Sequence, residues 1–415
     1  MQELRFAMYV CLLAISCTFI LGRSAAAAME TTLHAFTDGS DGGNPDAGLI
    51  ADSKGNLYST TLEGGGYGYG TVYKLTRPAS GWTQTVIYNF QGGTGDGAFP
   101  YYDLAFDAAG NLYGTTASGG IDWNSPSRGW GTVFELSPSG GKWTEKVIHF
   151  FATNYRPLSG LIINKAGDMF GETGGSATGV GGSIFGMKNE STGWKFETLF
   201  NFDGTDGGVP LAGLIFDNAG NLYGMTGSGG AVCCGTVFEL QRGANNTWTN
   251  SVLYSFGGLT DGGFPNAPLV SNASGKLYGT TMAGGDLSCG SDNEGCGVVF
   301  ELTLSRGIWT ETVLHSFTDS PDGNNPQAGM TFDKAGNLFG TTTVGGTDGY
   351  GTVFELMPQS GGEWKETILY SFTNGNDGAY PGDALLLGLG NVYSTASGGG
   401  EFGWGTVFEL PGAGK

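Results

Sequence analysis

A repeated phrase divides this chain of 415 residues into seven similar units, and this repetition limits the possible folds more than any other feature. The phrase Gly-Asn-Leu-Tyr and its variants return at intervals of 53 to 61 residues. The copies begin at Gly55, Gly110, Gly167, Gly220, Gly275, Gly336 and Gly390. A second phrase, Gly-Thr-Val-Phe-Glu-Leu, also has seven copies or variants. Such a period indicates supersecondary units that bury their apolar faces against one another.

Each unit predicts four short strands, as the second unit illustrates. Its strands are expected over residues 104–107, 111–116, 132–136 and 146–151. These runs are rich in β-branched and aromatic residues, and turn residues bound each of them. No stretch of ten residues after residue 28 shows a helical period. Four strands per unit predict an all-β fold of the β-propeller type.

The two ends of the chain complete one unit between them. The last unit stops after its third strand, at Leu410, whereas residues 31–36 match the fourth-strand pattern. Pairing these segments would remove the open sheet edges. We therefore expect a seven-bladed β-propeller with four-stranded blades, closed by the N-terminal strand pairing with the C-terminal blade. This single domain would span residues 29–415.

Residues 1–28 have the pattern of a signal peptide. Arg5 precedes a largely apolar stretch at 6–21, and residues 24–28 are small enough for a cleavage site. Lipidation at Cys17 is one alternative. An uncleaved anchor is another, because 16 largely apolar residues are just short of a membrane span. We expect an exported protein that is extracellular, periplasmic or at the outer cell surface, with no membrane span after cleavage.

The recurring phrases also carry a family resemblance. Asp-x-x-Gly-Asn-Leu-Tyr, followed by Gly-Gly and Gly-Thr-Val-Phe-Glu-Leu, resembles the bacterial GloVer tandem repeat of choice-of-anchor proteins. More distantly, the units are similar to NHL and SMP-30-type blades, and the spacing of Gly-Gly and Trp is kelch-like. The resemblance implies a secreted or surface protein with no assigned activity. The chain ends at Lys415 without a hydrophobic tail, so the resemblance leaves surface attachment open.

The charge of the chain limits its partners. Asp and Glu number 38 against 18 Lys and Arg, a net charge of -20. In a propeller, the loops that connect successive blades share a face with the loops joining the second and third strands. We call this the upper face, and its loops hold sixteen of the acids. A polyanionic backbone would be repelled, so no nucleic-acid partner is expected.

The acids and histidines predict no cofactor. Six of the connecting loops contain Asp-Gly-x-x-Pro, which favours turn formation, with calcium binding as the alternative. The three histidines, His34, His149 and His315, occupy a fourth-strand slot that other units fill with Tyr or Phe. That sharing indicates packing, so no metal site is expected.

Four cysteines follow the signal peptide. Cys289 and Cys296 lie in one predicted loop, and export permits disulfides, so this pair is the favoured one. Cys233 and Cys234 could form a vicinal bridge, stay reduced or reach the loop of the fifth blade. A metal site of four thiolates is a further alternative.

Two sets of side chains are candidate binding residues. The residue before the third-strand glycine is aromatic in four consecutive blades, and these positions form the aromatic arc: Tyr69, Trp130, Tyr350 and Trp404. The alternative is that these rings cover the loop glycines. Arg128 and Arg156 are the cations of the upper-face loops, and guanidinium groups suit carboxylate or sulfate.

The sequence thus predicts a secreted, monomeric propeller that binds a saccharide or a protein without catalysis. A polysaccharide-directed hydrolase or lyase using upper-face carboxylates is the second reading, and a structural envelope protein is the third. Serine–histidine–aspartate chemistry is not expected, because the histidines belong to separate blades.

Overall fold

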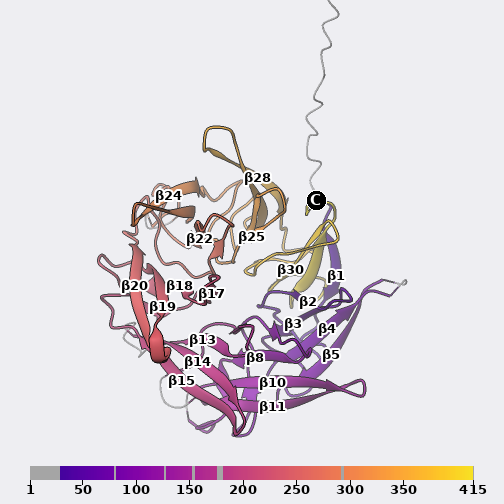
Figure 1. Cartoon of the computed structure of the whole chain (residues 1–415). Coiled ribbons are helices and arrows are strands. Elements are labelled where there is room, and N and C mark those ends of the chain that lie inside the picture. Colours follow the sequence, from indigo (N-terminus) through magenta and orange to yellow (C-terminus); the bar gives the residue numbers. More distant parts are fainter. Residues whose placement is uncertain are drawn as a thin grey trace, which may run out of the picture.

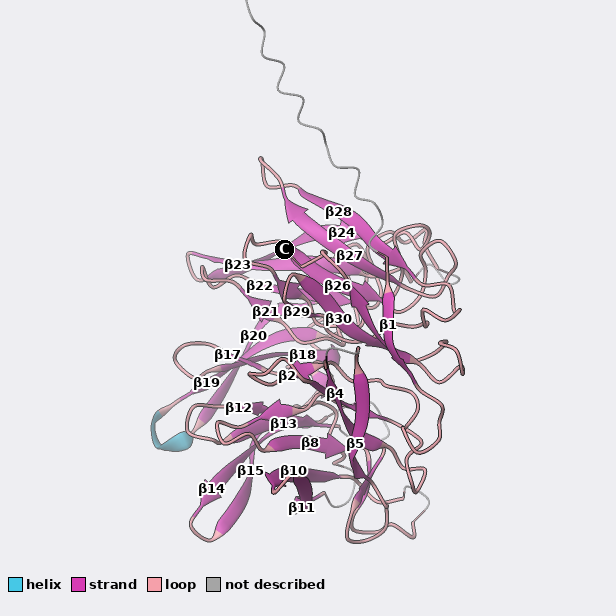
Figure 2. Cartoon of the chain, turned by 90° about the vertical axis from the view of Figure 1, so that its right-hand side faces the viewer, coloured by secondary structure: helices cyan, strands magenta, loops and turns pink. Residues whose placement is uncertain are grey.

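The structure is a computed structural model that describes residues 29–78, 81–125, 128–151, 155–174, 181–290 and 294–414. The predicted signal peptide at 1–28 lies outside the described residues. Seven antiparallel sheets surround a central axis, which confirms the seven-bladed β-propeller (Figure 1). In the described part, the helical content is one short turn, η1 (Ala244–Asn246), seen in Figure 2.

Each blade contains four strands, ordered from the axis outward. Blade one contains β2 (Ile50–Ala51), β3 (Leu57–Thr61), β4 (Thr71–Thr76) and β5 (Thr83–Asn89). Blade two contains β7 (Ala105–Phe106), β8 (Leu112–Thr116), β10 (Thr132–Ser139) and β11 (Lys142–Phe150). Blade three contains β12 (Ile162–Ile163), β13 (Met169–Thr173), β14 (Ser183–Glu190) and β15 (Gly193–Asn201). Blade four contains β17 (Ile215–Phe216), β18 (Leu222–Ser228), β19 (Thr236–Arg242) and β20 (Trp248–Ser255).

The remaining blades follow the same order. Blade five contains β21 (Val270–Ser271), β22 (Leu277–Thr281), β23 (Val298–Ser305) and β24 (Ile308–Ser316). Blade six contains β25 (Thr331–Phe332), β26 (Leu338–Thr342), β27 (Thr352–Pro358) and β28 (Trp364–Ser371). Blade seven contains β29 (Leu386–Gly388), β30 (Asn391–Ala396), β31 (Thr406–Leu410) and β1 (Thr31–Ala35). Small additions are β16 (Gly208–Pro210) on β18, and the pair β6 (Gly97–Ala98) with β9 (Ser118–Gly119).

The N-terminal strand closes the ring, as the sequence predicts. β1 pairs with β31 in antiparallel register, with Thr31 opposite Glu409 and Ala35 opposite Thr406. In Figure 1 the indigo strand β1 lies beside the yellow C-terminal blade. The backbone N–H of Phe36 extends the pairing by donating to the Gly405 carbonyl at 3.0 Å. β31 is therefore paired on both sides, with β30 and β1, and is not left as an open edge.

The predicted strand boundaries were too short in the outer hairpin of blade two. We expected 132–136 and 146–151, but β10 and β11 extend until Ser139 faces Lys142. Gly140 and Gly141 have φ of 58° and 80°. Two consecutive residues with positive φ form a tight hairpin turn whose twist matches that of the flanking strands. The glycines therefore lengthen the ladder instead of ending it.

Aromatic contacts join every blade to the next. The Phe at the end of each fourth strand packs edge-on against an aromatic ring in the third strand of the following blade, with centroids 5.1 to 5.5 Å apart. Phe90, for example, contacts Phe134, and both are fully buried. Buried rings of this size dominate core energetics. The recurring Phe is therefore the main apolar link between blades.

Candidate functional site

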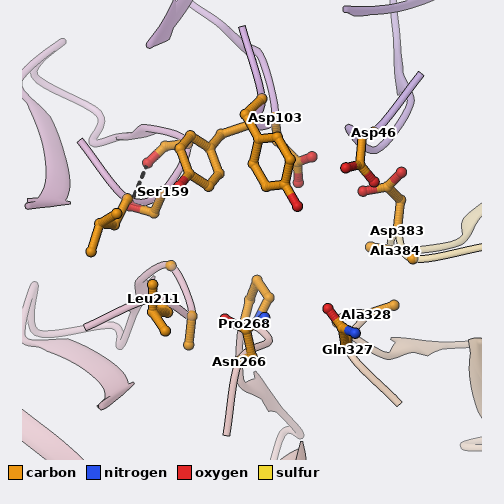
Figure 3. Close-up of a pocket in the computed structure, with 18 of the residues that line it drawn as sticks. Asp46, Asp103, Ser159, Leu211, Asn266, Pro268, Gln327, Ala328, Asp383 and Ala384 are labelled. Atoms are coloured by element: carbon orange, nitrogen blue, oxygen red, sulfur yellow. Dashed lines mark hydrogen bonds between the residues drawn. The ribbon is translucent and has the colours of Figure 1, made fainter. Parts of the chain in front are cut away.

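A pocket of about 420 Å³ opens on the axis of the ring, and all seven blades contribute to its wall. Most of the lining residues are among the three that follow each recurring proline, and Figure 3 shows their side chains converging. The polar members of these segments are Asp46, Tyr101, Tyr102, Asp103, Ser159, Asn266, Gln327 and Asp383. Thr343, Tyr380 and Ser397 complete the lining. The volume lies within the range of roughly 300 to 1,000 Å³ that is usual for small-molecule sites.

Backbone bonds between blades hold these segments on the axis. The residue before the proline has positive φ in several blades, for example 51° at Asn44 and 58° at Phe99. Its N–H donates to the carbonyl of the residue before the third-strand glycine of the preceding blade. Such bonds, of 2.7 to 3.0 Å, run from Asn44 to Trp404, Phe99 to Tyr69, Val209 to Gly181, Phe264 to Cys234, Asn325 to Cys296 and Tyr380 to Tyr350. Through these bonds, six of the pocket segments are positioned by the preceding blade.

Most blades place small residues at the axis, and the exceptions give the pocket its chemistry. Blades one, four and six have Ala-Gly as the second and third residues after the proline. Tyr102, Asp103 and Asp383 stand where those blades have Ala or Gly. Asp46 adds a carboxyl group from blade one, which lies between blades seven and two. The acids of the pocket therefore gather on three consecutive blades.

Burial changes the protonation of these carboxyl groups. Asp383 accepts a hydrogen bond from the Thr395 hydroxyl at 2.6 Å, but burial and the charges of Asp46 and Asp103 raise its pKa well above the ordinary value. Burial also raises the pKa of Asp103, although Asp103 accepts a bond from the Gly48 N–H at 2.6 Å. The pKa of Asp46 is raised for the same reason, and a hydrogen bond with Tyr101 opposes that shift. Burial therefore favours the neutral form of all three carboxyl groups, which in that form can donate as well as accept a hydrogen bond.

Glu172 adds a fourth buried acid beside the pocket. It occupies the β13 position where five other blades have threonine, and it is fully buried. Its Oε2 accepts a bond from the Gly213 N–H at 2.7 Å, whereas its Oε1 has no hydrogen-bond partner. Burial raises the pKa of Glu172 to about 8. Gly213 lines the pocket, so this carboxyl group lies directly behind the wall.

Two tyrosines supply aromatic surface to the pocket. The rings of Tyr101 and Tyr102 contact each other edge-on, with centroids 5.0 Å apart, and Tyr101 is 40% exposed. The charge of Asp46, then burial, raises the pKa of Tyr101, and burial raises the pKa of Tyr102. Both phenols therefore stay neutral and can donate hydrogen bonds at physiological pH.

The aromatic arc lies outside this pocket. All four rings are half-buried against the cores between blades, and none is among the described residues that line the pocket. Tyr69 contacts Phe99 and Trp123 at 5.7 and 5.3 Å. Tyr350 comes nearest to the pocket, because its ring lies 5.8 Å from that of the lining residue Tyr380. A binding role for the arc stays a prediction.

The two arginines differ in their relation to the pocket. Both are exposed. The charge of Arg156 acts on Tyr102, whose pKa it lowers against the effect of burial, so Arg156 lies near the pocket rim. Arg128 has φ of 52° in a blade-two loop, and its carbonyl accepts a bond from Gly119. Their proposed contact with an acidic ligand also stays a prediction.

Both cysteine pairs form disulfides in the structure. Cys289 bonds to Cys296 across a Cα separation of 5.6 Å, which is the favoured pair. Cys233 bonds to its neighbour Cys234, the vicinal alternative, with Cα atoms 3.7 Å apart. Cys234 and Cys296 occupy the position that the arc residues hold in other blades. Disulfides in blades four and five thus stand where blades six, seven, one and two have rings.

The aspartates of the connecting loops are engaged by their own loops. Asp96 accepts bonds from the Gln91 N–H and the Tyr88 hydroxyl, at 2.7 and 3.0 Å. His34 and His315 take the place of this tyrosine, and His315 Nε2 lies 3.0 Å from a carboxylate oxygen of Asp322. The shared slot of Tyr and His is thus a hydrogen-bonding position as well as a packing one. Across the described ranges, no group of three or more His, Cys, Asp or Glu side chains has an arrangement that could hold a metal ion.

The sequence reasoning missed the axial acids because it compared the loops and not the residues after each proline. Aligning those three positions across the units shows Ala-Gly replaced by Tyr102-Asp103 in blade two. The replacement of the recurring threonine by Glu172 is visible in the sequence, but its contact with Gly213 is visible only in the fold.

These observations define a seven-bladed β-propeller with a polar pocket on its axis. The chain belongs to the Gloeobacter/Verrucomicrobia repeat family, whose model matches residues 21–238, 124–291 and 287–415. None of the curated proteins matches it in sequence. In the described part of the chain, no helix is long and apolar enough to cross a membrane.

Solved structures share the fold at low identity. An ulvan lyase of a new polysaccharide lyase family is 11% identical, with a TM-score of 0.57, and the match covers 93% of this chain and 96% of that one. The same enzyme bound to -[GlcA(1-4)Rha3S]- gives a TM-score of 0.55 over the same shares, again at 11% identity. A protein from Lactobacillus plantarum is 15% identical, with a TM-score of 0.52 and coverage of 82% and 88%. At these identities the likeness concerns the fold alone.

Proposed function

We propose that this protein is an exported binding module that takes a saccharide into its axial pocket without catalysis. The observation that carries the proposal is the lining, which combines the exposed ring of Tyr101 and the half-buried ring of Tyr102 with carboxyl and amide groups in one concave site. Sites of this kind are the usual location of small-ligand binding.

The chemistry of the wall suits a sugar ring. The faces of Tyr101 and Tyr102 can stack against the C–H face of a pyranose. Asn266 and Gln327, on the opposite side of the pocket in Figure 3, offer both donors and acceptors to hydroxyl groups. A protonated Asp383 can also donate. Every hydroxyl of a bound sugar could thus exchange water for a protein partner, which avoids the cost of burying unpaired polar groups.

A longer glycan could extend from the pocket onto the upper face. Tyr380 lines the pocket and contacts Tyr350, so the aromatic arc would form an outer subsite beginning at blade six. Arg156, near Tyr102, and Arg128 would then receive an acidic group of such a chain. The two disulfides favour an oxidising compartment and support export. The closer likeness to choice-of-anchor proteins and to NHL, SMP-30 or kelch blades remains part of the proposal.

The test is a glycan array followed by titration calorimetry of the best neutral oligosaccharide. We expect a dissociation constant in the micromolar-to-millimolar range, typical of a few stacked rings and hydrogen bonds. Tyr101→Ala should weaken binding at least about tenfold, a loss of about 1.4 kcal/mol. Leu259→Ala is the control, because Leu259 is 60% exposed in an upper-face connecting loop but does not line the pocket. Equal binding by both variants would place the ligand elsewhere, and no glycan binding at all would refute the saccharide proposal.

Polysaccharide cleavage is the second candidate, and the paired carboxyls of Asp46 and Asp383 favour it. A pair in which one group is protonated and the other ionised could act as general acid and base. The same array glycans, incubated with the protein, would show new reducing ends or unsaturated products if this candidate is right. Turnover lost in Asp383→Asn would establish it, and binding without turnover would leave the first proposal.

A further inference from the structure

The acidic side chains of the axial pocket all lie on one side of it. Asp383, Asp46 and Asp103 line it from blades seven, one and two, and Glu172 lies behind the wall in blade three. The facing segments of blades four to six contribute neutral groups, among them Asn266 and Gln327. No lysine or arginine occurs among the described residues of the lining. Four carboxyl groups thus surround one side of a cavity without a cation in its wall.

The hydrogen bonds within the wall leave these carboxyls with acceptor capacity. Asp383 uses Oδ2 to accept from Thr395, and Asp103 uses Oδ1 to accept from the Gly48 N–H. A carboxylate has about four acceptor positions, so the second oxygen of each group can serve a ligand. In Figure 3 the carboxyl groups of Asp46 and Asp383 lie side by side on one wall of the cavity, with their oxygens directed toward each other. A donor placed between them could contact both.

Glu172 is a further buried acid behind this side of the pocket. Its side chain is fully buried, and its Oε1 has no direct hydrogen-bond partner, although an interaction with the Ser159 side chain lowers its pKa against the effect of burial. The unpaired oxygen belongs to a carboxyl group that bonds Gly213 in the pocket wall. A positive charge placed beside the carboxyl groups of the pocket wall would favour their ionised form.

We infer that the pocket selects an amino sugar, whose primary ammonium group lies between Asp46 and Asp383 while its ring rests against Tyr101. This inference rests on the proposed function and names its ligand class. An ammonium group donates three hydrogen bonds and is itself charged, so it matches two carboxyl acceptors better than a hydroxyl does. An acetylated amine loses the charge and two of the donors.

Three matched disaccharides test the inference, because they differ at carbon 2 alone: cellobiose with hydroxyl, the glucosamine dimer with ammonium, and the N-acetylglucosamine dimer with acetamide. Titration calorimetry at pH 7 and low salt should show the glucosamine dimer binding about tenfold more tightly than cellobiose, since bonds to charged groups are about 1 to 1.5 kcal/mol stronger. The advantage should shrink at high salt. It should disappear in Asp46→Asn and in Asp383→Asn, so that each variant binds the glucosamine dimer and cellobiose with similar affinity.

Asp348→Asn is the control for general attraction to an acidic surface. Asp348 is exposed in an upper-face loop, and its replacement removes the same charge without touching the pocket. If Asp348→Asn reduces the advantage as much as the pocket variants do, the inference is wrong. Tighter binding of cellobiose or of the acetylated dimer would also overturn it, yet would leave the saccharide proposal standing. Failure of all three sugars in a protein that binds another glycan of the array would likewise overturn this inference alone, whereas the absence of any glycan binding would remove both proposals.

Discussion

Asp46 and Asp383 lie side by side on the wall of the axial pocket, although one belongs to the first repeat of the chain and the other to the last (Figure 3). The N-terminal strand brings them together, because β1 joins the last blade and so places blade one beside blade seven. Burial, together with the charges of Asp46 and Asp103, raises the pKa of Asp383. Closure of the ring therefore creates the pocket, and it also brings together the carboxyl groups whose charges raise the pKa of Asp383.

Replacing Asp383 by a neutral residue should stabilise the folded protein, because it removes a buried group whose ionisation is unfavourable. A raised pKa means that the folded state holds the proton more tightly than the unfolded state, so stability falls as pH rises above the ordinary carboxyl pKa. Asp383→Asn carries no charge at any pH and can still accept from Thr395. We expect its free energy of unfolding in urea to exceed that of the native protein by about 1 to 3 kcal/mol at pH 8, and the gain to vanish near pH 4. A loss of stability at pH 8 would contradict this reading, and Asp348→Asn is the control.

Carboxyl pairs between blades should make the whole protein less stable above neutral pH. Burial, then the charge of an aspartate from the adjoining connecting loop, raises the pKa of Glu145 and Glu311 to about 7. The pKa of Glu366 is likewise raised to about 7, chiefly by burial. Their stabilising protons are lost as pH rises through 7, so the melting temperature should fall between pH 6.5 and 8. Starting at pH 6.5 avoids the opposite effect of His149, whose pKa burial lowers to about 4.

The variant that tests these pairs combines Glu145→Gln, Glu311→Gln and Glu366→Gln. It should make the decline of melting temperature between pH 6.5 and 8 shallower, because glutamine does not titrate. Glu172, whose pKa is raised to about 8, and Glu30, whose pKa is raised to about 7, should retain part of the decline. Glu363→Gln, an exposed change next to β28, should leave the decline as it is in the native protein. If the triple variant declines as steeply as the native protein, these glutamates are not the source of the pH dependence.

Closure by the N-terminal strand should carry a large share of the stability. Deleting residues 29–37 would expose β31 as an open edge and remove Phe36, which is fully buried against Tyr73. The single change Phe36→Ala should already cost about 3 to 5 kcal/mol in urea unfolding, from lost burial and the cavity left behind. Met29→Ala is the matched control, because Met29 is 84% exposed. If Phe36→Ala unfolds at the same urea concentration as the native protein, this strand contributes little to the stability of the fold.

The disulfide of Cys289 and Cys296 should stabilise the blade-five loop measurably. The bond closes a loop with a sequence separation of 7, for which the loss of chain entropy in the unfolded state predicts about 2.5 kcal/mol. We expect the double variant Cys289→Ser, Cys296→Ser to unfold at lower urea concentration by that amount. Adding a reductant to the native protein should reproduce the shift. If neither experiment shows a shift, other contacts hold the loop.

The sequence by itself determined the architecture of this protein. The recurring phrases specify strand, turn and strand within each unit of 53 to 61 residues, and such contacts are local. The unpaired third strand at Leu410 and the matching segment at 31–36 also specified the closure, because hydrogen-bonding edges must be satisfied. The favoured cysteine pair could be chosen in the same way, since both residues lie in one loop.

Only the tertiary structure decided which side chains meet. Asp46, Asp103 and Asp383 are far apart in sequence, and nothing in their local motifs marks them as neighbours. The pairing of Glu172 with Gly213 likewise depends on the packing of blade three against blade four. The pKa of a carboxyl group depends on how much water the surrounding blades exclude and on which charges they bring near. Those quantities exist only once seven units of nearly equal sequence have closed into a ring, which is why the repeat pattern shows the fold and the ring closure creates the site.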